Sequence, residues 1–320
     1  MTVALAVPLI RRRQLEEIGW YSRRVNRELE RGYPTRVRNG VYIRSADFES
    51  LTVEGRIVVR ARTLALVATT RPVFCGITAA VLQGMPCVRD DGRLHVLTAA
   101  DRAGAGPDIV RHRGLLEAQH YVDLDGLRCT PLAQTVADVA RGESRETAVS
   151  IADAAVRERA FTPPGNYDVE EAERFREEAL TWANRTTRGR RTAERILLFA
   201  DGRAQRPGES ISRLRLHDLG FAPPSLQVPV AGPNGTTYWV DFGLDDVDAR
   251  GEFDGRIKYR ELAGGAGRSP FEVMDAEKKR EDWIRGTTQR RLVRWGWEDI
   301  RDAATLGRRL RAFGIDPPGR

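Results

Sequence analysis

Residues that cross-link or anchor a chain are scarce in this sequence. It has three cysteines, Cys75, Cys87 and Cys129, an odd number without CxxC spacing. That pattern argues against a disulfide framework and a zinc cluster, and it favours a reducing cytoplasm. No stretch approaches the roughly 20 apolar residues of a membrane-spanning helix. Apolar residues 1–10 precede the basic run 11–13, whereas a secretory signal places positive charge first. We therefore expect a cytoplasmic protein without a membrane partner.

Lysine is also rare, and its scarcity shapes the charge of the chain. Only Lys258, Lys278 and Lys279 occur, while Lys and Arg together number 52 and the formal net charge is +7. An excess of positive charge favours acidic partners, of which nucleic acid is the commonest for a soluble protein. With 320 residues, 41% of them hydrophobic, the chain is expected to fold into two or three domains.

The first predicted domain, residues 11–50, has the pattern of a winged helix. Two helices and a two-stranded hairpin are expected, at residues 11–19, 21–31, 35–38 and 41–44. Proline disfavours helix at the residue before it, so Pro34 follows the end of the second helix. Asn39-Gly40 between two β-prone runs is the strongest short signal for a hairpin.

Arginine is concentrated in this domain. Residues 10–45 contain ten arginines and four glutamates. The spacing of Arg23, Arg24, Arg27 and Arg31 places them on one side of the second helix, which predicts a helix that enters the major groove of DNA. Arg36 and Arg38 on the hairpin would contact backbone phosphates. The alternative is a basic helix that is simply solvated.

The second predicted domain, residues 51–160, is mixed α/β. Strands are expected at residues 93–99, 122–124 and 127–130, the last two joined at Asp125-Gly126. A helix capped by Thr130 and a second helix at 144–159 follow. His95, His112 and His120 lack the spacing of metal ligands, so this domain is expected to pack between the ends or to mediate protein contacts. Residues 161–206 are expected to form a linker and connecting helices.

The third predicted domain, residues 207–320, has a more specific order of elements. A helix at 209–220 is followed by strands at 223–230, 236–244 and 249–254. A helix at 272–285, a strand at 290–297 and a final helix from about residue 299 complete the domain. Helix, three strands, helix and strand is an order that resembles the core of the PD-(D/E)xK nucleases. The predicted fold class is therefore α+β or α/β throughout, with a restriction-endonuclease-like C-terminal domain.

Acidic residues fall at positions of interest within that order. Glu209 opens the first helix, Asp241 ends the second strand, and Glu252 and Asp254 lie two apart on the third, where they share a face. Clustered carboxylates repel one another unless a divalent cation binds them, and hard oxygen ligands select Mg²⁺ or Mn²⁺. We expect Glu209, Asp241 and Glu252 to bind the metal, which would activate water against a phosphodiester.

Lys258 follows four residues after Asp254 and is positioned to neutralise charge on a phosphate or to orient the water. On the later helix, Lys278, Lys279, Arg280 and Arg285 would line a phosphate track. The alternatives are ordinary ones. The acids of residues 241–252 are then turn or edge residues, and the basic residues are a solvated helix surface.

Five separated motifs of this domain resemble a known family. They are PGESISRLRLHDLG, VDFG, GEFDGRIKY, EKKREDWIR and LVRWGWEDI, in this order over residues 207–311. Together they look like the very-short-patch-repair-endonuclease-like domain. The resemblance assigns Glu209, Asp241, Glu252 and Asp254 to the acidic site. One departure stands out, because active members of the wider fold place lysine two residues after the strand acid, where this chain has Asp254.

The N-terminal run SRRVNRELERGYPTRVRNGVYIR resembles the winged-helix segment of AbiEi-type antitoxins of type IV toxin–antitoxin systems. The two resemblances together imply an antitoxin-like regulator that binds double-stranded DNA and carries a nuclease-fold tail, with a cognate toxin as a second partner. The rival hypothesis is a Mg²⁺-dependent DNA endonuclease targeted by the same N-terminal segment. A third hypothesis is a protein-interaction module that inhibits a toxin through residues 55–160.

Overall fold

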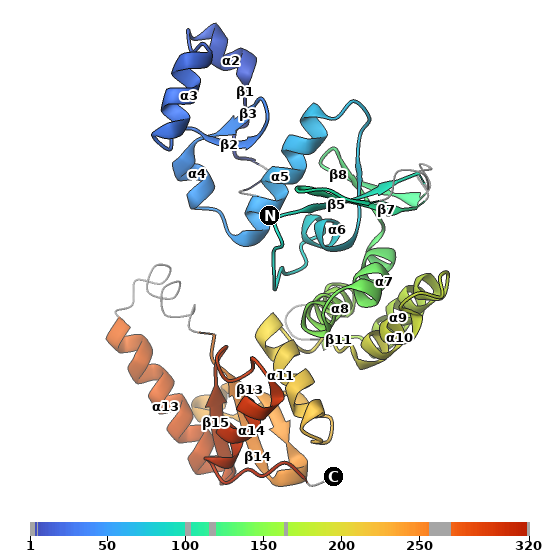
Figure 1. Cartoon of the computed structure of the whole chain (residues 1–320). Coiled ribbons are helices and arrows are strands. Elements are labelled where there is room, and N and C mark those ends of the chain that lie inside the picture. Colours follow the sequence, from blue (N-terminus) through green and yellow to red (C-terminus); the bar gives the residue numbers. More distant parts are fainter. Residues whose placement is uncertain are drawn as a thin grey trace. The chain divides into compact units, whose positions relative to one another are not determined.

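The computed structural model in Figure 1 describes residues 4, 6–99, 104–114, 120–162, 166–255 and 270–318. The chain divides into two compact units. Unit 1 comprises Met1–Ala155 and Glu173–Phe199, and unit 2 comprises Val156–Ala172 and Ala200–Arg320. Both units combine helices with strands, so the expected α+β class is confirmed. Among the described residues, every helix is too short or too polar to span a lipid bilayer.

The N-terminal part of unit 1 contains the expected helices and hairpin. Its elements are β1 (Ile10–Arg11), α2 (Arg12–Glu17), α3 (Ser22–Glu30), β2 (Thr35–Arg38) and β3 (Val41–Ile43). The three strands form one antiparallel sheet in the order β1-β3-β2. Val25 is the one described residue of α3 that is buried, and it packs with Leu15 and Tyr42. A single apolar stripe therefore anchors α3, and its other faces remain exposed.

A six-stranded sheet forms the centre of unit 1. The strand order is β6-β7-β5-β4-β9-β8, with bounds β4 (Val73–Phe74), β5 (Leu94–Thr98), β6 (Gly104–Ala105), β7 (Ile109–Arg113), β8 (Val122–Leu124) and β9 (Leu127–Cys129). Helices α4 (Ser45–Glu49), α5 (Val53–Val67) and α6 (Gly76–Leu82) precede or separate these strands. Ile57 and Leu64 of α5 pack with Phe74 and Leu94 of the sheet in one apolar core of this unit.

Two histidines that the sequence did not connect meet on this sheet. The Nδ1 atom of His95 lies 3.1 Å from Nε2 of His112, and the two rings stack. His95 is buried. Burial, followed by the neighbouring His112, lowers the pKa of His95 to about 4. The pair is therefore neutral and structural at physiological pH.

Four helices follow the sheet, namely α7 (Leu132–Gly142), α8 (Arg145–Ala160), α9 (Val169–Ala183) and α10 (Arg190–Phe199). Helix α7 begins one residue later than expected, with Pro131 at the N-cap, because the Thr130 hydroxyl is engaged with that of Thr135 at 2.6 Å. Residues 161–206, expected to form a linker and connecting helices, contain α9 and α10 and also a short hairpin, β10 (Phe161–Thr162) and β11 (Asn166–Tyr167).

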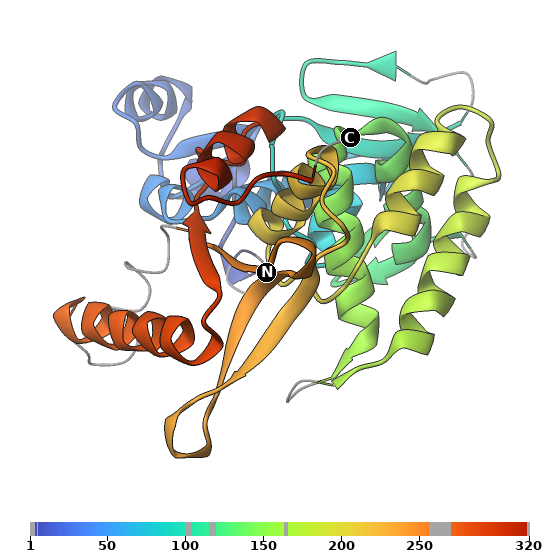
Figure 2. The same cartoon turned by 90° about the horizontal axis from the view of Figure 1, so that it is seen from below.

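Unit 2 contains the predicted order of helices and strands. Its elements are α11 (Pro207–Asp218), β12 (Ser225–Ala231), β13 (Thr237–Leu244), β14 (Ala249–Phe253), α13 (Pro270–Thr288), β15 (Arg291–Trp295) and α14 (Ala303–Arg311). The sheet order is β12-β13-β14-β15. β12 pairs antiparallel with β13 and β13 antiparallel with β14, whereas β15 runs parallel to β14. Figure 2 shows the long β12–β13 hairpin extending beyond the rest of the sheet.

The two faces of this sheet are covered by different helices. On one face, the buried Trp295 stacks on Phe242 and donates to the Ser212 hydroxyl of α11 at 2.8 Å. On the other, Ile284 of α13 packs with Val240 and Leu292. The sheet therefore lies between α11 with α14 and α13. Glu209, at the start of α11, and Glu252, on β14, are both positioned by this arrangement.

Candidate functional site

The carboxylates of Glu209 and Asp241 come together in unit 2 although they belong to different elements. Glu209 lies in the first turn of α11 and is buried, and Asp241 lies on β13. The Nε2 atom of Gln227 is 3.3 Å from Oε2 of Glu209 and 3.5 Å from Oδ1 of Asp241. One side-chain amide thus bridges the two acids.

Gln227 was missed by the sequence reasoning. Its backbone φ is +50°, a conformation that side chains with a Cβ atom rarely adopt. It interrupts the ladder of β12 between Leu226 and Val228, which pair with Phe242 and Val240. A lone amide side chain inside the otherwise apolar run SLQVPV was the available signal.

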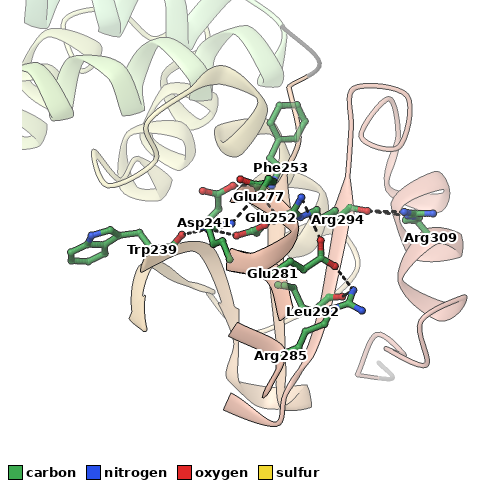
Figure 3. Close-up of polar contacts among 11 residues, drawn as sticks. Trp239, Asp241, Glu252, Phe253, Glu277, Glu281, Arg285, Leu292, Arg294 and Arg309 are labelled. Carbon is green, nitrogen blue, oxygen red and sulfur yellow. Dashed lines mark hydrogen bonds and ion pairs between the residues drawn. The ribbon is translucent and has the colours of Figure 1, made fainter. Parts of the chain in front are cut away.

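Asp241 also connects this cluster to β14. Its Oδ2 atom accepts a hydrogen bond of 2.8 Å from the backbone N–H of Phe253, the residue after Glu252. The backbone of β14 next to Glu252 is therefore fixed by Asp241. Three of the predicted site residues, Glu209, Asp241 and Glu252, consequently belong to one region of unit 2. Figure 3 draws Asp241 and Glu252 of this region.

Glu252 has two cationic partners that the sequence did not predict for it. Its Oε1 atom lies 2.5 Å from Nη2 of Arg280, and its Oε2 atom lies 2.8 Å from Nε of Arg294. The Glu252 side chain is only 9% exposed, and the two arginine side chains are about a fifth exposed, at 21% and 22%. Two arginines therefore compensate the buried negative charge.

Arg294 is the centre of this network, as Figure 3 shows. Besides Glu252, it contacts Glu277 at 2.5 Å and Glu281 at 3.6 Å. Its backbone carbonyl accepts hydrogen bonds from Nε and Nη2 of Arg309 at 3.1 and 3.0 Å. Because it pairs with Glu252 in register on β15, the strand pairing itself places the guanidinium beside the carboxylate. In the sequence, the alternation of RRLVRWGW was the signal for the position of Arg294 on its strand.

Asp254 lies just beyond β14, and its backbone N–H donates to the carbonyl of Trp295 at 2.8 Å. Its side chain is half-buried and lines an open pocket of about 390 Å³. The pocket is also lined by Arg294, Trp295, Gly296, Trp297, Glu298, Asp299 and Arg309. Asp254 is thus adjacent to the Glu252 network. Lys258 lies outside the described residues.

These residues allow a test of the expected Mg²⁺ site. Glu209 and Asp241 supply oxygen donors of the kind that Mg²⁺ selects. The third expected ligand, Glu252, is bound by two arginines. Within the described ranges, no group of three or more His, Cys, Asp and Glu side chains is arranged to hold a metal ion. The described part of the site therefore fits two of the three expected ligands, and metal binding stays a prediction.

Three of the four predicted basic residues of α13 also have partners. Lys279 is exposed and forms an ion pair of 2.7 Å with Asp275, and Arg285 forms one of 2.7 Å with Glu281. Arg280 is directed to Glu252 and to the carbonyl of Trp239, at 2.6 Å, and not toward solvent. Lys278 is exposed.

The predicted DNA-contacting residues of unit 1 are more accessible. Arg23, Arg24, Arg27 and Arg31 of α3 and its C-cap are all exposed, as is Arg36 of β2. Arg24 lies over the Trp20 ring at 4.7 Å, and Arg27 and Arg31 share Glu28 at 3.5 and 3.3 Å. Arg38 differs, since it forms an ion pair of 2.7 Å with Asp108 and is only 20% exposed.

Comparison with known proteins places the chain beside proteins of unknown role. No family model matches it. Two uncharacterized proteins from two strains of Mycobacterium tuberculosis are each 30% identical to it over 182 residues, which is 57% of this chain. The chain matches 62% of the length of each of these relatives.

Proposed function

We propose that the protein binds double-stranded DNA through unit 1, as an antitoxin-like transcriptional regulator with a nuclease-fold tail. The observation that carries the proposal is the exposed arginine face of α3 next to a two-stranded hairpin. Val25 is the fully buried anchor of the helix and Leu29 packs beside it, while Arg23, Arg24 and Arg27 are exposed. A helix with this distribution can approach a groove without disturbing the core of the unit.

The charges of α3 favour phosphate contacts for a physical reason. Guanidinium groups form bidentate hydrogen bonds with phosphate oxygens, and each phosphate neutralised releases condensed counterions. Of the three arginines, Arg23 has no acidic partner among the described residues and Arg24 is stacked on Trp20. Arg36 on the hairpin would add a backbone contact, as expected for a wing. Arg38 is not included, because Asp108 holds it.

The test is the salt dependence of DNA binding. Replacing Arg23, Arg24 and Arg27 with alanine is expected to weaken the dependence of log K on log salt by roughly 1.8 to 2.7, since each phosphate contact contributes about 0.9 and Arg27 is shared with Glu28. The matched control replaces Arg12, Arg13 and Arg44, which lie beside Glu16, Glu17 and Asp47. Equal slopes and affinities for parent and α3 variant would remove the proposal.

A second candidate function is favoured by the convergence of Glu209 and Asp241 around Gln227. We propose, as this second candidate, that the protein is a Mg²⁺-dependent DNA endonuclease. Mg²⁺ held by the two carboxylates would supply a bound water of lowered pKa and stabilise charge on the scissile phosphate. Gln227 would orient both carboxylates, and the N–H of Phe253 would hold Asp241 in place.

Cleavage of supercoiled and mismatched DNA with Mg²⁺ or Mn²⁺ tests this candidate. Asp241→Asn should abolish cleavage, whereas Asp245→Asn, which removes an exposed turn carboxylate, should not. Absence of cleavage by the parent, or equal cleavage by the Asp241→Asn variant, leaves only the regulator. The cognate toxin and the cytoplasmic location are proposed from the N-terminal resemblance and from three free cysteines. Co-purification with a toxin encoded by a neighbouring gene would test the former.

A further inference from the structure

The turn between α9 and α10 and the first half of α10 carry a second concentration of arginine. Residues 185–195 read RTTRGRRTAER, with a single acidic residue, Glu194. All five arginines are exposed, namely Arg185, Arg188, Arg190, Arg191 and Arg195. We call this set the α9–α10 arginine surface. It belongs to unit 1.

Among the described residues, these arginines have no carboxylate partners close by. Among the described residues, none of the five takes part in an ion pair within 4.0 Å, whereas Arg27 and Arg31 of α3 share Glu28. Arg185 stacks on Trp182 at 3.6 Å, and Arg195 donates to the carbonyl of Arg191. Like charges one helical turn apart, such as Arg191 and Arg195, destabilise a helix by a few tenths of a kcal/mol. The arrangement therefore has no stabilising role that its contacts reveal.

The backbone under this surface is nevertheless fixed. Gly189 adopts φ +73°, and a Cβ atom there would lie 2.6 Å from the carbonyl oxygen of Arg141. Arg141 also donates to the carbonyl of Trp182 at 3.2 Å, which ties the end of α9 to α7. On α10, Ala193, Ile196 and Leu197 are buried. The arginines thus project from a packed scaffold.

We propose that the α9–α10 arginine surface is a second contact for the phosphate backbone of duplex DNA. The inference rests on the proposed function, in that DNA is the partner of the chain. An array of unpaired guanidinium groups along a helix matches a polyanion with repeating phosphates. Interfaces with DNA are much more positively charged than interfaces between proteins, which favours DNA over an acidic protein. The surface contacts backbone, so it adds affinity without sequence preference.

The experiment replaces Arg188, Arg191 and Arg195 with glutamine in the full chain and measures binding of a fluorescent duplex over a range of salt. Loss of three phosphate contacts should weaken the slope of log K against log salt by roughly 2.7. Between about 50 and 200 mM salt, the variant should then lose roughly 40-fold less affinity than the parent. An unchanged slope and affinity would overturn the proposal.

Two matched variants make the result specific. Replacing Arg13, Arg203 and Arg301, which pair with Glu17, Asp201 and Asp302, removes the same charge and should leave the slope unchanged. Replacing the three surface arginines with lysine should retain most of the slope. If the lysine variant loses as much as the glutamine variant, or the control loses as much as either, the surface is not a phosphate contact.

The outcome is distinguishable from failure of the proposed function. The α3 variant tests whether α3 reads DNA, and the glutamine variant tests the α9–α10 surface in the same assay. If the parent protein does not bind DNA, both proposals are wrong. If only the α3 variant loses affinity, the α9–α10 arginine surface is not a contact. If only the α9–α10 variant loses affinity, the proposal for α3 is wrong. Poly-glutamate serves as a competitor. If it displaces DNA at equal charge concentration and binds the parent as tightly, an acidic protein is the partner and the inference is wrong.

Discussion

A substitution of Glu252 tests directly whether this residue of the candidate site has a structural or a catalytic role. Glu252→Gln keeps the shape of the side chain and removes its charge. Arg280 and Arg294, each about a fifth exposed at 21% and 22%, would then face each other without a shared anion. Removing one partner of a buried ion pair costs about 3 to 5 kcal/mol. Because the arginines retain Glu277, we expect the lower end, about 3 kcal/mol.

Urea unfolding followed by tryptophan fluorescence measures this cost, since Trp295 is buried next to β14. The matched control is Asp245→Asn. Asp245 pairs with Arg250 and Arg290 at 2.9 Å but is 56% exposed, so its loss should cost less than about 1 kcal/mol. Adding Arg294→Met to Glu252→Gln should recover part of the stability, because it removes one of the two uncompensated charges.

A Glu252→Gln variant as stable as the parent, or more stable, would refute this reasoning. Such a result would mean that Glu252 is held in an unfavourable environment, as a metal ligand without its metal is. In that case Mg²⁺ should stabilise the parent against urea and should not stabilise the variant. The two outcomes therefore assign Glu252 either to the ion-pair network or to the metal site.

Three further predictions concern the scaffold. Gly208→Ala should cost about 1 to 3 kcal/mol in urea unfolding, because its Cβ would lie 2.0 Å from the Phe253 ring, and Phe253→Leu should relieve it. Val25→Ala removes the buried anchor of α3, so it should cost about 2 kcal/mol and speed hydrogen exchange of the α3 amides. Burial lowers the pKa of His95 in the folded protein to about 4, below its value in the unfolded chain. As pH falls, the unfolded chain is therefore protonated at His95 before the folded protein is. Unfolding free energy should therefore drop by about 2 kcal/mol from pH 7 to about 4.5, and less in His95→Asn.

Much of the architecture followed from local sequence signals. The helices and strands of residues 207–311 were expected within a few residues of their observed ends, because turns at Asn234-Gly235 and the alternation of β13 mark them clearly. The hairpin at Asn39-Gly40 is likewise where its turn signal predicted it. Domain boundaries differ, because the helices of residues 169–199 pack by contacts that are distant in sequence.

The partners within the candidate site were less predictable. Glu209 and Asp241 were expected to converge, but the bridge by Gln227 depends on a left-handed backbone conformation that its residue type disfavours. The pairing of Glu252 with Arg294 depends on the register between β14 and β15. The segment between these strands in the sequence includes the 19 residues of α13. Spacing along the chain cannot fix such a register, since a shift by one residue reverses every side chain.

Under the proposed function, the distribution of paired and unpaired arginine predicts which surfaces contact DNA. On α13, three of the four residues expected to form a phosphate track are paired with carboxylates, Lys279 with Asp275, Arg280 with Glu252 and Arg285 with Glu281, while Lys278 is exposed. In unit 1, the α9–α10 arginine surface has no such partners among the described residues. An arginine already paired with a carboxylate gains little by exchanging it for a phosphate, whereas an unpaired one gains the whole interaction. Most of the salt-dependent affinity should therefore reside in unit 1, and replacing Lys279 and Arg285 should change the slope far less than replacing Arg188 and Arg191.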